Sequence, residues 1–207
     1  IYFDGALVAD VAEQDELFVW RIEEEIVKKA VEFSRRNGNY LELYSSEHFF
    51  AEKSNWSDVI HKEYFGVTPQ RGSFDGIWDR ERIIKAEVVV RSEAELEQYR
   101  RFKQEFSGLL HFSVARSPSF PDIEFINITQ RRVSKGNATE KLAGYFGIKT
   151  TEIIAIGDGS NDIPLFEVAG FSVAMGNARE ELKEIADYTT LSVEEGGVAA
   201  AIEKFLL

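Results

Sequence analysis

The second part of the chain alternates short apolar segments with helical ones across short connections. Beyond about residue 130 the pattern predicts helices at 136–146, 162–169, 178–186 and 197–205, and strands at 153–156, 171–174 and 188–191. Strands that alternate with helices in this way form a parallel sheet covered by helices. This part is therefore predicted to be a doubly wound, Rossmann-like α/β unit.

The first 120 or so residues follow a different pattern, which mixes hairpin-like strands with two longer helices. Apolar positions at helical spacing predict a helix over 22–36, ended by Asn37-Gly38, and an amphipathic helix over 93–106. The remaining expected elements are a short helix at 57–65, strands at 1–8, 16–20, 40–53, 83–90, 109–115 and 123–128, and a loop at 117–122. This mixture predicts a separate α+β domain at 1–122, followed by the α/β domain at 123–207.

Composition excludes several classes of protein. Apolar residues make up 44% of the chain, which favours a folded core over disorder. The net charge is −12 and both parts are acidic, which argues against nucleic acid as the main ligand. No apolar run is long enough for a membrane-spanning helix, so no membrane partner is expected. The absence of cysteine and of a secretory signal pattern fits a reducing, cytoplasmic setting.

The apolar run at 153–156 ends in Gly157-Asp158-Gly159-Ser160-Asn161-Asp162. The carboxyl ends of parallel strands border a ligand crevice, and two carboxylates at such a rim can hold Mg²⁺, which prefers oxygen ligands. Asp158 and Asp162 are therefore predicted to bind Mg²⁺. The alternative is that Asp162 only caps the following helix and that Ser160 and Asn161 only form the turn.

A lysine precedes the first helix of the α/β part, in Val133-Ser134-Lys135-Gly136. About one helix and one strand separate Lys135 from Asp158, so a parallel sheet would bring both to the same rim. There the ammonium would neutralise phosphoryl charge, although a lone lysine at a helix start is usually only solvated. Lys135 and Asp158 are the predicted catalytic residues. Lys135 and Asn161 are the predicted phosphate ligands, although Asn161 would alternatively orient Lys135 or close the turn.

Together with Ala-Gly-Phe-Ser-Val-Ala-Met-Gly-Asn-Ala at 169–178, these segments resemble the haloacid dehalogenase superfamily and, within it, the Cof-type phosphatases with a large α/β cap. The resemblance implies that 1–122 is the cap that selects the substrate and that 123–207 is the C-terminal part of the hydrolase core. It also implies that Lys135 binds phosphate, that Asp158 binds magnesium, that Asp162 lies in or just behind the metal shell, and that Asn161 contacts the phosphate.

One part of the family pattern is missing. The family's nucleophile lies in an Asp-x-Asp-Gly-Thr segment, which Tyr2-Phe3-Asp4-Gly5 fits only superficially, because a phenol does not replace the attacking carboxylate. Residues 1–8 instead resemble the opening strand of the cap. The nucleophile is therefore expected outside these 207 residues. The chain is expected to be a fragment that is inactive alone and that self-associates through the strand edge beside 153–156.

The function expected from these features is an Mg²⁺-dependent phosphatase of small phosphorylated metabolites, sugar phosphates above all, acting through an aspartyl-phosphate. The alternatives are a non-catalytic phosphate-binding or interaction fragment, and a phosphosugar mutase. Aromatic residues of the first part are expected mostly in its core, and the three histidines near the surface. Asn127 would face the crevice in one of two orientations of its strand.

Overall fold

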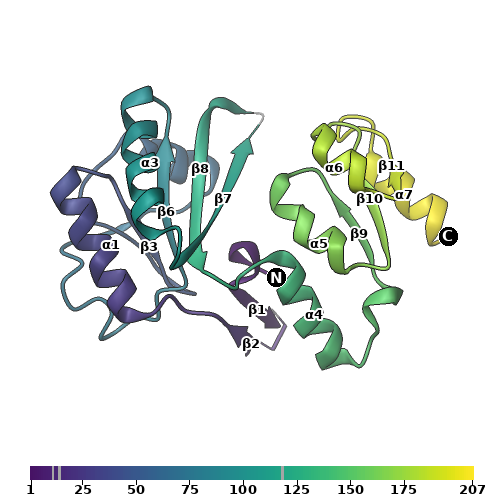
Figure 1. Ribbon diagram of the computed structural model, residues 1–207, viewed down its shortest axis with the longest axis horizontal. Helices are drawn as coiled ribbons and strands as arrows, with labels where there is room; N and C mark the ends of the chain where they lie inside the picture. Colours follow the sequence, from purple (N-terminus) through teal and green to yellow (C-terminus); the bar gives the residue numbers. More distant parts are fainter. Residues whose placement is uncertain (11, 14, 118) are drawn as a thin grey trace.

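The computed structural model describes residues 1–10, 12–13, 15–117 and 119–207. Two lobes, each built around its own sheet, lie next to each other, and the N-terminal segment lies between them (Figure 1). The predicted class, a parallel α/β core joined to a separate α+β cap, is confirmed. Pro118, which belongs to the loop predicted at 117–122, lies outside the described residues.

The larger lobe contains a six-stranded sheet in the order β5-β4-β3-β6-β8-β7. Every neighbouring pair is antiparallel except β4 and β5. The strands are β3 (Glu42–Tyr44), β4 (Phe49–Ala51), β5 (Gln70–Arg71), β6 (Lys85–Val90), β7 (Leu110–Ser117) and β8 (Phe120–Gln130). The helices are α1 (Glu24–Asn37), α2 (Ser57–Tyr64) and α3 (Glu93–Phe106).

Alternation along the strands gives this sheet two different faces. Leu43, Val88 and Ile126 join α1 and α3 in the hydrophobic core on one face. Because successive side chains of a strand point to opposite sides, their neighbours Glu42, Glu87 and Phe125 belong to the other face. That second face carries several polar side chains, although Glu42 and Glu87 are buried. It is the face on which the cavities described below open.

Local sequence signals explain where the two long helices begin and end. The helix α1 ends at Gly38, whose φ of 72° is the left-handed conformation that glycine adopts without strain. The helix α3 begins with a capping box, in which the Ser92 hydroxyl accepts from the Glu95 amide and the Glu95 carboxylate accepts from the Ser92 amide. Both helices therefore match the sequence prediction to within two residues.

The smaller lobe has a parallel three-stranded sheet in the order β11-β10-β9, with β9 at one edge. Its strands are β9 (Ile154–Gly157), β10 (Phe171–Ala174) and β11 (Tyr188–Thr189), and its helices are α4 (Lys135–Phe146), α5 (Ile163–Val168), α6 (Glu180–Ile185) and α7 (Gly197–Phe205). Two 3₁₀ turns, η2 (Thr150–Glu152) and η3 (Ser160–Asp162), flank β9.

The N-terminal segment joins the lobes. A 3₁₀ turn, η1 (Phe3–Gly5), leads into a hairpin of β1 (Leu7–Asp10) and β2 (Asp15–Val19), which packs against α4. The chain then enters the larger lobe through residues 20–23 and returns through residues 131–134. Ala6, Leu7, Ile84 and Val133 pack together at this double crossing.

The domain boundary predicted at 122/123 falls inside β8. Residues 124–129 pair with β6 and Gln130 pairs with β7, all within the larger sheet, so the change from one sheet to the other comes after Gln130. The sequence places the boundary too early because the loop predicted at 117–122 is largely strand, with β7 ending at Ser117 and β8 starting at Phe120. The prediction also missed the two-residue strand β5.

Candidate functional site

The predicted lysine and one of the predicted acids form an ion pair across the α4–α5 contact. Lys135 Nζ lies 2.5 Å from Asp162 Oδ1, although the two residues are 27 positions apart. The other oxygen, Asp162 Oδ2, accepts from the backbone amides of Asp158 (3.0 Å) and Gly159 (3.1 Å). Asp162 is buried, and its carboxylate therefore ties the lysine to the turn that follows β9.

Two glycines allow this close approach. A Cβ on Gly136 would lie 2.1 Å from the Pro164 carbonyl oxygen, so the first turn of α4 contacts α5 only because residue 136 has no side chain. A Cβ on Gly157 would lie 2.7 Å from the Asp162 side chain. Because Gly136 and Gly157 have no side chains, the segments that carry Lys135 and Asp162 can pack closely enough for the two side chains to meet.

Asp158 is placed differently from Asp162. Its side chain is exposed at the carboxyl end of β9, and Asp158 Oδ2 accepts one hydrogen bond from Asn177 Nδ2 at 3.3 Å. Lys135, Asp158 and Asn161 line one cavity of about 480 Å³ together with Asn177 and Arg179. An exposed carboxylate at the rim of such a cavity offers the oxygen ligands that Mg²⁺ prefers.

Asn161 points toward the N-terminal segment. Its side-chain amide donates to Asp4 Oδ1 at 3.1 Å, while Asp4 Oδ2 accepts from the Ser113 hydroxyl (2.5 Å) and from Asn127 Nδ2 (2.9 Å). Asp4 has a φ of 55° and follows Phe3 with a φ of 50°, which is an uncommon left-handed conformation for residues other than glycine. One carboxylate in a constrained backbone thus joins the turn after β9 to strands β7 and β8 of the larger sheet.

Asp4 continues a polar row that crosses the larger sheet. Glu42, Glu87, Asn127 and Ser113 face one another in register on β3, β6, β8 and β7. Asn127 donates to Asp4 and lines a second cavity on this face, and it is not among the residues that line the cavity of Lys135 and Asp158. Neither Asp4 nor this row was identified as part of the site from the sequence, because the register between strands far apart in the chain determines it.

The far end of the row is a buried cluster. Within the described residues, one group of side chains could hold a metal ion, and it consists of Glu42, His61 and Glu87, whose ligand atoms lie within 4.8 Å of one another. Asp158 and Asp162 do not belong to this group. His61 Nε2 lies 3.1 Å from Glu42 Oε1, and the Tyr44 hydroxyl donates to Glu42 Oε2 at 2.8 Å. The Lys85 ammonium contacts Glu87.

His61 is buried, so the expectation that it lies near the surface is wrong. Burial alone would lower the pKa of His61, but the hydrogen bond and charge of Glu42, together with the charge of Glu87, raise it above 6.5. Burial likewise raises the pKa of Glu87. His61 and Lys85 each lie within ion-pair distance of a carboxylate of the cluster.

The structure brings Lys135, Asp158, Asn161 and Asp162 to the carboxyl end of β9, as the spacing predicts. In the described part of the chain, no helix has both the length and the apolar character needed to cross a membrane.

A family model described as haloacid dehalogenase-like hydrolase matches residues 1–202. A phosphoglycolate phosphatase from Archaeoglobus fulgidus is 35% identical over 162 residues, covering 71% of this chain and 72% of the relative. The 5-amino-6-(5-phospho-D-ribitylamino)uracil phosphatase YwtE from Bacillus subtilis is 40% identical over 112 residues, covering 54% of this chain and 38% of the relative.

The crystal structure of TM0651 from Thermotoga maritima matches with a TM-score of 0.80 at 26% identity, over 99% of this chain and 74% of that one. Several of the curated relatives are much longer than the region they share with this chain, which spans 42% or less of their length.

Proposed function

The chain belongs to the haloacid dehalogenase-like hydrolase family, as the resemblance of its lysine and acidic segments implied, and on that premise we propose that the intact protein is a Mg²⁺-dependent phosphatase of small phosphorylated metabolites. The observation that carries the proposal is the convergence of Lys135, Asp158 and Asn161 on one cavity, with Lys135 held by Asp162 at 2.5 Å. The relatives' names support it, since both curated relatives described above are phosphatases of phosphorylated small molecules.

The proposed roles follow from what each side chain already contacts. Lys135 neutralises phosphoryl charge, and the buried Asp162 keeps its ammonium at the rim of the cavity. Asp158 is the proposed magnesium ligand because its carboxylate is exposed there. Both oxygens of Asp162 are engaged by Lys135 and by two backbone amides, which favours a place behind the metal shell.

The ion, when bound, would neutralise charge on the phosphoryl oxygens. Asn161 is the proposed amide contact to phosphate, and its bond to Asp4 fixes its orientation. We further propose that transfer passes through an aspartyl-phosphate on a nucleophile outside these 207 residues, so this chain supplies charge neutralisation and metal binding but not the attacking group. The larger lobe is the proposed cap, which contacts the organic part of the substrate.

The proposal is tested by phosphate release from p-nitrophenyl phosphate by the intact protein with and without Mg²⁺. Lys135→Met and Asp158→Asn should each lower kcat/KM by roughly 10²- to 10³-fold, the loss typical of removing one charge-stabilising group. Lys141→Met is the matched control, because Lys141 is an exposed lysine further along α4. Activity that persists in Lys135→Met, or that needs no divalent ion, would contradict the proposal.

A further inference from the structure

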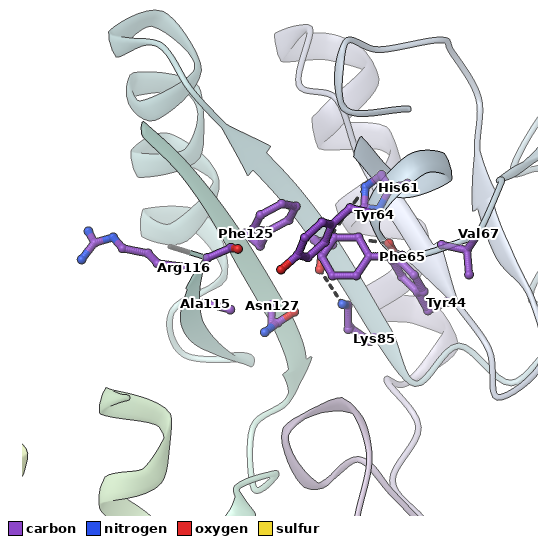
Figure 2. A pocket seen from close by; sticks show the side chains of 12 residues that line it. Tyr44, His61, Tyr64, Phe65, Val67, Lys85, Ala115, Arg116, Phe125 and Asn127 are labelled. Carbon is purple, nitrogen blue, oxygen red and sulfur yellow. Dashed lines mark hydrogen bonds and ion pairs between the residues drawn. The ribbon is translucent and has the colours of Figure 1, made fainter. Parts of the chain in front are cut away.

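A second cavity, of about 500 Å³, opens on the polar face of the larger sheet and is walled by aromatic side chains. Figure 2 shows Tyr64, Phe65 and Phe125 grouped on one side, with Tyr44 and Lys85 toward the other. Cavities of about 300–1,000 Å³ are the usual size of sites for drug-sized molecules. A two- or three-carbon acid would fill little of this space.

The aromatic side chains of the wall contact one another but are only partly covered. Phe65 stands edge-on to Phe125, with ring centroids 5.7 Å apart and an interplanar angle of 89°, and Tyr64 stands edge-on to Phe65 at 5.0 Å. Phe125 is buried, whereas Phe65 and Tyr64 are 48% and 52% exposed. Large apolar side chains left open beside a cavity mark a surface that a flat, apolar ligand can cover.

The opposite side of the cavity is polar, and its charged groups contact one another. Lys85 contacts Glu87 and lies 4.3 Å from the centre of the Tyr44 ring, and His61 lies beside Glu42 and Glu87. Both basic side chains are therefore already within ion-pair distance of a carboxylate and are not free to pair with an ionised ligand group. These side chains suit the hydrogen-bonding edge of a neutral group better than a carboxylate.

This cavity adjoins the proposed phosphate site at the end of β7. Ala115, Arg116 and Ser117 line both this cavity and the one that contains Lys135 and Asp158. The Arg116 guanidinium is already paired with Glu124, so its charge is largely compensated. A phosphate ester bound at Lys135 can therefore extend its organic part past β7 toward Phe65 and Phe125.

We propose that the aromatic cavity binds the leaving group of the substrate and that this group is a neutral, planar, unsaturated ring system. The proposal rests on the proposed phosphatase function for the position of the phosphate, and on Phe65, Tyr64 and Phe125 for the ring. It differs from the sugar phosphates expected from the sequence, because an unsaturated ring presents apolar faces with no hydroxyl groups, whereas a sugar ring carries hydroxyl groups at its rim that Phe65 and Phe125 cannot hydrogen-bond.

The test compares three phosphate esters as ligands, by isothermal titration calorimetry in the absence of divalent ions. They are 2-naphthyl phosphate, which is planar, cyclohexyl phosphate, which is neutral but puckered, and phosphoglycolate, which is small and carries a carboxylate. The planar ester should bind roughly 5- to 150-fold more tightly than the other two, the range that stacking one planar base on an aromatic side chain supports. Equal affinity for the three esters would overturn the proposal.

Variants locate the effect. Phe65→Ala should remove most of the preference for 2-naphthyl phosphate and leave phosphoglycolate unchanged, whereas Phe65→Tyr should keep it. Val59→Ala is the matched control, because Val59 is an equally exposed apolar side chain on α2 outside the cavity lining. A preference that survives Phe65→Ala would contradict the assignment of the ring to this cavity.

Lys135→Met separates this proposal from the phosphatase function. If the phosphate lies at Lys135, this change should weaken all three esters alike. If Phe65→Ala weakens binding of the planar ester and Lys135→Met does not, the ring site is supported and the proposed phosphate site is wrong.

Discussion

Replacing Gly136 by alanine should destabilise the protein, although alanine is the better helix former. The new Cβ would lie 2.1 Å from the Pro164 carbonyl oxygen, 1.3 Å short of the 3.4 Å at which ordinary contact begins. Overpacking of this kind costs about 1–3 kcal/mol, and the gain in helix propensity is at most about 1 kcal/mol. The free energy of unfolding should therefore fall by about 1–2 kcal/mol, and Lys135 should move away from Asp162.

Gly144 provides a control within the same helix. Apart from the adjoining residues and the backbone of its own helix, no atom lies within 4 Å of the position its Cβ would take, so Gly144→Ala should stabilise the protein by about 0.5–1 kcal/mol. Both variants would be compared by urea unfolding followed by circular dichroism. A Gly136→Ala protein as stable as Gly144→Ala would show that α4 and α5 do not approach closely, and the packing argument for the position of Lys135 would be lost.

Three further outcomes are expected from urea unfolding. Asp162→Asn should lower the free energy of unfolding by about 1–3 kcal/mol, because the buried carboxylate binds Lys135 and two backbone amides. Asp158→Asn should leave the free energy of unfolding within about 0.5 kcal/mol of the original value. Equal effects of the two changes would contradict the different placement of these carboxylates. The free energy of unfolding should decrease as the pH rises from 6.5 through the raised pKa of His61. The reason is that the His61 imidazole binds its proton more tightly in the native state than in the unfolded chain. His61→Gln should flatten this decrease, and an unchanged slope between about pH 6 and pH 8 would refute the assignment. Phe102→Ala, at a fully buried position between α3 and the sheet, should cost about 3–5 kcal/mol, and a loss below about 1 kcal/mol would mean that the core there is loose.

The parts of the site that the sequence predicts are those that local order determines. Lys135 starts a helix and Asp158 directly follows a strand, and in a parallel sheet these two positions meet whatever the details of packing. The apolar spacing of α1 and the capping box of α3 likewise act within a few residues of each helix. Predictions of this kind need no knowledge of which strands become neighbours.

The missed parts depend on contacts between distant segments. Asp4 reaches Asn127 and Asn161 only after the N-terminal turn has folded back between the lobes, across 123 and 157 positions. Glu87 lies between Ala86 and Val88 in β6, the place of an outward-facing polar residue in many strands, and it is buried because Glu42 and His61 come to lie beside it. His61 looked like a surface residue for the same reason, since its partner Glu42 is 19 positions away.

The double crossing at residues 20–23 and 131–134 limits how the lobes can move. Because these two adjacent segments connect the lobes, one lobe can rotate about the line that joins the segments. A twist of one lobe against the other is opposed, because it would separate Ile84 from Val133. The aromatic cavity would accordingly travel along a single arc relative to Lys135. Asp4 lies close to this pivot and bonds to both lobes, so a movement that separates them would strain its bonds to Ser113 and Asn127 on one side against its bond to Asn161 on the other.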